Sequence, residues 1–82
     1  MKKLTIKIII ADDHELFRDG LKLMLNSFEH IIICSEATNG KELVEQVNLH
    51  HPDVVITDIN MPEMDGIEAA RILSNQYFYS VL

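Results

Sequence analysis

The sequence IKIIIADD, residues 6–13, joins a nearly unbroken run of β-branched side chains to two consecutive aspartates. Lys7 alone interrupts the apolar run, and such continuity is typical of a strand that neighbouring elements cover on both faces. We therefore expect a buried strand over Ile6–Ala11 that presents Asp12 and Asp13 at its carboxyl end.

The rest of the chain alternates helical and strand patterns. Apolar residues from position 17 to 28 recur at spacings of three and four, which predicts a helix beginning near Glu15. Arg18 and Lys22 fall on the opposite, polar side of this helix. Two more strands are expected at residues 31–37 and 54–58, and two more helices after Asn39 and after Asp65, the latter in a capping box. Connections of this length exclude hairpins, so the sequence predicts an α/β fold with a parallel sheet and helices on both faces.

Acidic side chains follow two of the predicted strands. Asp12 and Asp13 come after the first strand, and Asp58 ends the third. Because the carboxyl ends of adjacent parallel strands meet at one edge of a sheet, we expect the three carboxylates to converge. Such a cluster repels itself unless a cation neutralises it, and oxygen ligands favour Mg²⁺. Once the metal screens the negative charge, the Asp58 carboxylate is able to attack phosphorus and form an aspartyl phosphate.

Size and charge limit the classes of function. The 82 residues, 48% of them hydrophobic, suffice for one small domain and leave no room for a second. The net charge of −6 argues against direct binding to nucleic acid or to an anionic membrane. The single cysteine, Cys34, lies in an apolar run and is expected to be a small buried hydrophobe. With no apolar segment long enough for a signal peptide or a membrane span, we expect a cytoplasmic protein.

Two motifs, taken together at their spacing, resemble those of the receiver domains of two-component response regulators. They are IADDH at residues 10–14 and VVITDINMP at residues 54–62, the second completed by Asp65 and Gly66. The resemblance covers about residues 1–73 and implies a flavodoxin-like (CheY-like) fold. Residues 11–21 further resemble the branch of the family whose members carry a LuxR-type helix-turn-helix output domain, and we expect no output domain within residues 1–82.

The resemblance implies a role for each acidic residue. Asp58 is the phospho-acceptor, a sensor histidine kinase is its donor, and Mg²⁺ assists the transfer. Asp13 and Asp58 ligate the metal directly, Asp12 acts through water, and Asn60 contributes its backbone carbonyl. The domain is accordingly expected to be a signalling phosphoacceptor and not an enzyme.

Two other functions are weighed against this one. The alternative is a non-catalytic, self-associating interaction fragment. A phosphatase of the haloacid-dehalogenase type also uses a strand-end aspartate, but it needs Asp-x-Asp on one strand, and Asp58-Ile59-Asn60 departs from that pattern.

Residues 74–82 depart from the family. Receivers continue through a fourth strand that ends in Ser or Thr and a fifth that ends in Lys, and neither residue has a counterpart here. The predicted domain is therefore incomplete, with three βα units followed by Val81 and Leu82 as either the stub of a fourth strand or a foreign ending. Without these strands the third strand becomes an unpaired edge, which predicts a homodimer or a swapped oligomer formed through it. Loss of the hydroxyl and the lysine is expected to impair phosphoryl transfer.

The four histidines are predicted to be surface residues. His14 stands near the predicted metal, but as a residue of the first helical turn it is expected to face solvent. His30, His50 and His51 fall in different loops, and an adjacent pair rarely directs both rings at one ion.

Overall fold

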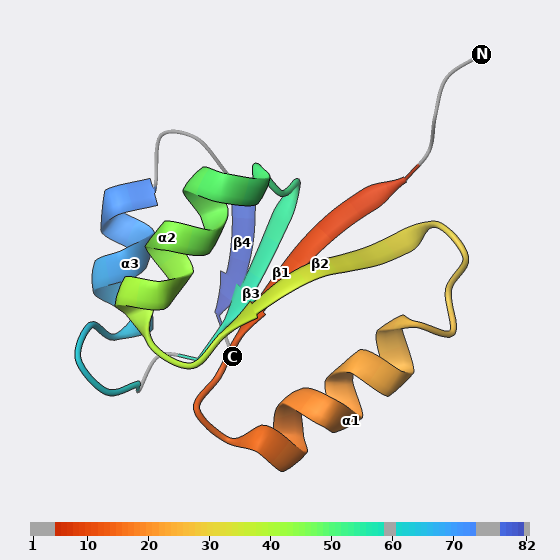
Figure 1. Ribbon diagram of the computed structural model, residues 1–82, viewed down its shortest axis with the longest axis horizontal. Coiled ribbons are helices and arrows are strands. Elements are labelled where there is room, and N and C mark those ends of the chain that lie inside the picture. The colour runs from red at the N-terminus through yellow and green to blue at the C-terminus, as the bar shows by residue number, and fades with distance from the viewer. Residues whose placement is uncertain (1–4, 59–60, 74–77, 82) are drawn as a thin grey trace.

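The computed structural model describes residues 5–58, 61–73 and 78–81. Strands and helices alternate along the chain (Figure 1). The elements are β1 (Ile6–Ala11), α1 (Glu15–Leu25), β2 (Ile31–Ala37), α2 (Gly40–His50), β3 (Val54–Thr57), α3 (Gly66–Leu73) and β4 (Phe78–Val81).

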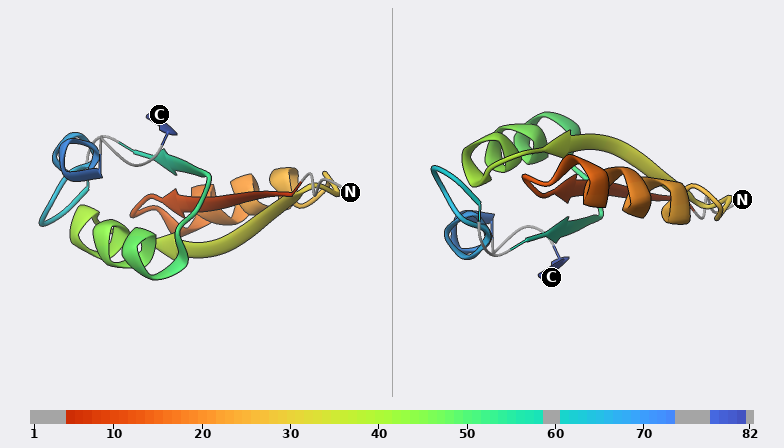
Figure 2. Two further views of the ribbon diagram at one scale, coloured as in Figure 1. Left: turned by 90° about the horizontal axis from the view of Figure 1, so that it is seen from above. Right: turned by 90° about the horizontal axis from the view of Figure 1, so that it is seen from below.

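The four strands form one parallel sheet in the order β2-β1-β3-β4. In the view from below, α1 lies in front of the sheet, and in the view from above α2 does, so the two helices cover opposite faces (Figure 2). α3 packs beside α2. The predicted parallel α/β architecture is thereby confirmed.

The prediction that the third strand forms an unpaired edge is wrong. β4 pairs with β3 over its whole length, from Val54 opposite Phe78 to Thr57 opposite Val81. The extended segment satisfies the backbone groups on the open side of β3, which an edge strand would leave without partners. The fourth strand is thus a four-residue strand beginning at Phe78, whereas Leu82 lies outside the described residues. Because β4 occupies the open side of β3, self-association through that side of β3 is no longer expected.

The main core lies between the sheet and the helices α2 and α3. Ile9 and Ala11 of β1 and Val55 of β3 point to this side, where they pack with α2, α3 and Met61. The buried helical contributors are Leu43, Val47 and Ala69. Because successive strand residues face opposite sides, Ile8 and Ile10 point to the other face, towards α1, and they too are buried.

Helix α1 is rotated relative to the prediction. Its half-buried positions are Arg18, Leu21, Lys22 and Leu25, and it has no buried residue. The side predicted to be polar therefore includes the part that faces β2, because Arg18 and Lys22 both reach the Glu36 carboxylate there, at 3.0 and 2.7 Å. Long side chains of this kind bury their aliphatic stems while the charged ends find a partner. Consequently three of the apolar residues that set the predicted periodicity stay about half exposed: Phe17 49%, Met24 56% and, beyond the helix end, Phe28 49%.

The amino ends of α2 and α3 are capped as predicted. The Asn39 side chain accepts a hydrogen bond from the Glu42 amide at 2.8 Å, and the Asp65 side chain accepts one from the Glu68 amide at 2.9 Å. Gly40, the first residue of α2, adds a second link, since its amide donates to the Met64 carbonyl at 2.6 Å. The first turn of α2 is therefore held against the loop that follows β3.

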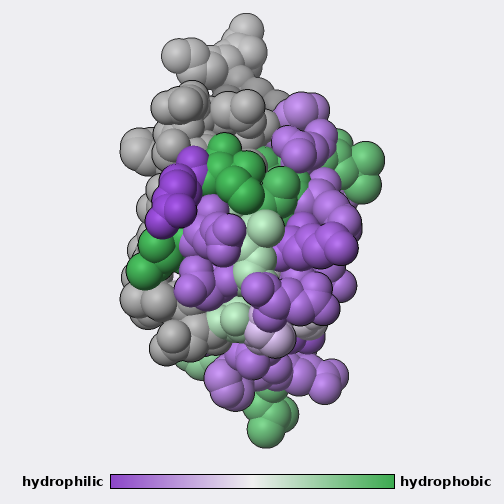
Figure 3. All heavy atoms as spheres, turned by 90° about the vertical axis from the view of Figure 1, so that its left-hand side faces the viewer, coloured by the Kyte–Doolittle hydropathy of each residue, from purple (hydrophilic) through white to green (hydrophobic). Residues whose placement is uncertain are grey.

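The outer surface over α2 and α3 is predominantly hydrophilic, with hydrophobic side chains interspersed (Figure 3). Leu49, Ile67 and Ile72 are among the exposed apolar residues of these two helices. Among the described residues, no helix has the length and apolar character needed to cross a membrane.

Candidate functional site

The ends of β1 and β3 bring three aspartates together. Ala11 and Thr57 are register partners, and the Asp58 amide donates to the Ala11 carbonyl at 2.9 Å. As a result, one carboxylate oxygen each from Asp12, Asp13 and Asp58, together with a ring nitrogen of His14, all lie within 4.8 Å of one another. The predicted convergence of the aspartates is confirmed. Asn60, the fourth predicted metal ligand, lies outside the described residues.

Burial differs among the three carboxylates. The Asp12 side chain is 4% exposed, and its Oδ1 accepts a hydrogen bond from the His14 amide at 2.8 Å. Asp13 has a side chain that is 34% exposed, and Asp58 is half-buried. Asp12 therefore lies buried at the bottom of the cluster, and Asp13 and Asp58 form a rim that solvent and ligands reach.

His14 belongs to this rim. As predicted, its ring is exposed, at 70% of the side chain, but its Nδ1 lies 2.9 Å from Asp12 Oδ1 and 3.1 Å from Asp13 Oδ1. The hydrogen bond to Asp12 and the negative charge of Asp13 raise the pKa of His14 above its usual value of 6.5. This contact was not predicted from the sequence, where its signal is a histidine two residues after a strand-end aspartate, at the N-cap of α1.

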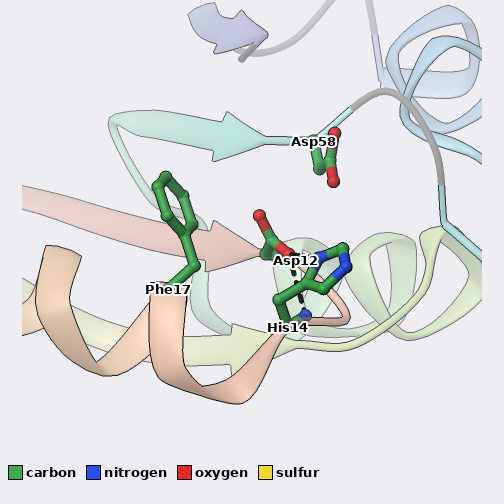
Figure 4. A pocket seen from close by; sticks show the side chains of 4 residues that line it. All are labelled: Asp12, His14, Phe17 and Asp58. Carbon is green, nitrogen blue, oxygen red and sulfur yellow. Dashed lines mark hydrogen bonds and ion pairs between the residues drawn. The ribbon is translucent and has the colours of Figure 1, made fainter.

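The cluster opens into a pocket of about 320 Å³ lined by Asp12, His14, Phe17 and Asp58. The Asp12 and Asp58 side chains enter it from the ends of neighbouring strands, and Phe17 of α1 lies on the other side (Figure 4). Phe17 also lines an adjoining apolar groove along α1 with Leu16, Gly20, Leu21 and Met24. Phe17 therefore lies where the acidic site meets the apolar groove.

The donor atoms fit a hard divalent cation. The three carboxylates at the sheet edge supply oxygen ligands, which suit Mg²⁺ better than softer metals, and His14 Nδ1 is the one nitrogen donor among the described atoms of the cluster. A divalent charge also offsets the repulsion among carboxylates held this close. Cys34 does not belong to the cluster, since it lies half-buried in β2 against the core, where burial raises the pKa of its thiol.

Arg18 contacts the site, although its position in the sequence did not predict this. Its Nη1 donates to the Asp12 backbone carbonyl at 2.7 Å, and its Nε donates to Glu36 at 3.0 Å. The signal available was a cation in the first turn of the helix that follows the acidic pair.

Comparison with known proteins identifies what this arrangement resembles. The model of the response regulator receiver domain matches residues 8–81, which extends beyond residue 73, where the resemblance was expected to end. The transcriptional regulatory protein DegU of Brevibacillus brevis is 42% identical over 72 residues, which are 88% of this chain and 30% of the relative. A protein-glutamate methylesterase/protein-glutamine glutaminase of Pyrococcus horikoshii is 39% identical over 72 residues, 88% of this chain and 20% of that protein. The chain spans less than a third of the length of these two relatives.

Solved structures give the same result. The signal receiver domain of NarL from Mycobacterium tuberculosis superposes with a TM-score of 0.89 at 29% identity, covering 94% of this chain and 64% of that one. The response regulator domain of Thermotoga maritima CheB gives a TM-score of 0.86 at 28% identity, covering 94% and 60%.

Proposed function

The chain belongs to the family of response regulator receiver domains, and from this premise we propose that Asp58 accepts a phosphoryl group from the phosphohistidine of a sensor histidine kinase, with Mg²⁺ held at the same sheet edge. One observation carries the proposal: the Asp58 carboxylate stands within 4.8 Å of the carboxylates of Asp12 and Asp13. A lone strand-end aspartate would be an ordinary turn residue, whereas three converging carboxylates supply both a nucleophile and a cation site.

The chain's own residues have distinct tasks in this proposal. An Asp58 oxygen forms a bond to phosphorus while the phosphorus–nitrogen bond of the donor breaks, so the phosphoryl group changes carrier without net hydrolysis. Asp13 and Asp58 would hold the cation directly and Asp12 through water, and we assign a further protein ligand to the backbone carbonyl of Asn60. Bound Mg²⁺ supplies positive charge to the oxygens of the transferring group.

The shape of the pocket supports access for a protein donor. Asp58 is half-buried and lines an open pocket, so a phosphorylated side chain can reach it without displacement of the core. The buried Asp12 carboxylate is less accessible as a nucleophile, since it is 4% exposed and accepts a hydrogen bond from the chain.

The regulated process that we propose is transcription. DegU of Brevibacillus brevis and YdfI of Bacillus subtilis, 42% and 38% identical to this chain, are both transcriptional regulatory proteins by name. The net charge of −6 disfavours contact between this chain and DNA, so we assign DNA binding to a separate output region of such a regulator.

Phosphorylation by a small donor tests the proposal directly. The protein is incubated with Mg²⁺ and acetyl phosphate, and intact-mass spectrometry measures the gain of one phosphoryl group. We expect the adduct on the wild type and on Asp65→Asn, which alters a nearby exposed carboxyl group that caps α3. We expect no adduct on Asp58→Asn or when EDTA replaces Mg²⁺. An adduct of equal yield on Asp58→Asn would overturn the assignment of the acceptor.

A further inference from the structure

The backbone of Asp12 is held from both sides. Its amide donates to the Ala37 carbonyl of β2 at 3.0 Å, and its carbonyl accepts from Arg18 Nη1 at 2.7 Å. We propose that Arg18 is a positioning residue for the acidic site: it fixes the peptide between Asp12 and Asp13 and thereby sets where both carboxylates stand. The inference rests on the proposed Mg²⁺ site and deepens it.

The chemistry of an arginine side chain suits this task. Its guanidinium is planar, stays charged and presents several donors in a fixed arrangement. Here Nη1 binds the Asp12 carbonyl, while Nε binds Glu36 Oε1 at 3.0 Å. The side chain is 13% exposed, so solvent screens these contacts little. Because the peptide group is planar, a hydrogen bond that holds the Asp12 carbonyl also restricts the direction in which the chain leaves towards Asp13.

Glu36 anchors the Arg18 side chain to the sheet. It belongs to β2, a strand directly paired with β1, and its carboxylate binds both Lys22 and Arg18. Arg18 thus connects the edge of the sheet, the first turn of α1 and the backbone that precedes Asp13.

A purely electrostatic role of Arg18 and a positioning role predict opposite changes in the affinity for Mg²⁺ when Arg18 is removed, so the role can be tested. A positive charge near a cation site opposes metal binding, so removal of the charge alone would strengthen the affinity for Mg²⁺. Removal of a residue that orients the ligands weakens it, and lost outer-shell partners typically cost about 10–100-fold in metal affinity. The direction of the change therefore distinguishes the two effects.

Lys22 provides a matched control. It is also a cation of α1 that binds Glu36, at 2.7 Å, and it pairs with Asp19 at 3.4 Å. Lys22→Met removes the same unit of charge and a bond to the same carboxylate, and it leaves the bond from Arg18 to Asp12 in place.

The experiment is a calorimetric titration of Mg²⁺ into the wild type, Arg18→Met, Arg18→Lys and Lys22→Met, each shown by circular dichroism to be folded. We expect the dissociation constant of Arg18→Met to rise about tenfold and that of Lys22→Met to stay unchanged or to fall. Arg18→Lys keeps the charge and should lie between the wild type and Arg18→Met. If Arg18→Met does not fold, Arg18→Lys carries the test, because its weakened binding cannot come from a change in charge.

A second readout needs no metal. The carbonyl ¹³C resonance of Asp12 reports the hydrogen bond from Arg18, and we expect it to shift in metal-free Arg18→Met but not in Lys22→Met. Wild-type-like Mg²⁺ affinity in a folded Arg18→Met, or an unshifted Asp12 carbonyl, would overturn the role of Arg18 alone. Failure of the wild type to bind Mg²⁺ would instead remove the metal site of the proposed function and this inference with it.

Discussion

Replacing Gly40 by alanine would place a methyl group in a clash with the carbonyl oxygen of Met64, 2.6 Å from the Met64 carbonyl carbon and 2.9 Å from the Asp65 carbonyl oxygen. All three atoms belong to the backbone, so no side chain can rotate to make room. Either α2 or the loop after β3 must move, and the hydrogen bond from the Gly40 amide to Met64, 2.6 Å long, is lost in the process.

The structure sets the size of the effect. Overpacking of this kind costs about 1–3 kcal/mol, and the contact with backbone points to the upper end. The lost hydrogen bond adds about 1 kcal/mol, and the better helix propensity of alanine offsets about 1 kcal/mol. We expect Gly40→Ala to lower the free energy of unfolding by about 3 kcal/mol, a large share of the stability of a small domain.

Gly20 is the matched control. It lies within α1, and a Cβ at this position meets nothing within 4 Å. Alanine there should therefore raise the free energy of unfolding by about 0.5–1 kcal/mol through helix propensity alone. Urea denaturation followed by circular dichroism at 222 nm measures both variants. Equal midpoints for the two variants, or a more stable Gly40→Ala, would refute the close approach of α2 to the loop.

Three further changes have defined outcomes in the same denaturation assay. Glu63 has a left-handed backbone with φ of 68°, a conformation that glycine adopts more readily than glutamate. Glu63→Gly should therefore raise the free energy of unfolding by about 0.5 kcal/mol, and a lower value would contradict this backbone geometry. Asn39→Ala removes the side chain that accepts a hydrogen bond from the Glu42 amide and should lower the free energy of unfolding by about 1 kcal/mol. Asn39→Ser keeps a capping oxygen and should retain most of the wild-type stability. The hydrogen bonds from Lys22 and then Arg18 lower the pKa of Glu36 below its usual 4.5. The stabilisation that ionised Glu36 gives the folded state is therefore fully present above pH 4.5 and is lost as the pH falls through the lowered pKa. Glu36→Gln should be less stable than the wild type at pH 7, by up to about 1 kcal/mol, and the difference should shrink below pH 4.5; a difference that does not vary with pH would contradict the ion pairs.

Local patterns in the sequence were sufficient to predict the first two strands and the helix caps. The β-branched runs at Ile6–Ala11 and Ile31–Ala37 became β1 and β2 with the predicted bounds. Asn39 and Asp65 cap their helices because the capping interaction depends on neighbours only three residues away. The convergence of the aspartates also followed from the sequence, since in a parallel sheet it needs only the order of the strands.

Contacts between distant elements were not predictable in the same way. The periodicity of α1 showed where its apolar residues lie, but the rotation of the helix depends on Glu36 of β2, whose partners Arg18 and Lys22 were assigned to the polar side. The pairing of β3 with β4 was missed because four residues from Phe78 carry too weak a pattern to reveal a strand. For His14, exposure was predicted well, but its contact with Asp12 depends on the turn between β1 and α1.

The first strand of the chain occupies an inner position of the sheet, between β2 and β3. During synthesis, β1 emerges from the ribosome before either neighbouring strand does, and residues 12–57 must follow before β3 can pair with it. At about 5–20 residues per second, this interval lasts roughly 2–9 s. For that time the isoleucines at positions 8–10, which are 0–5% exposed after folding, are open to chaperones and to other nascent chains. The isoleucines of β1 are therefore a segment that a chaperone would protect until β3 has emerged.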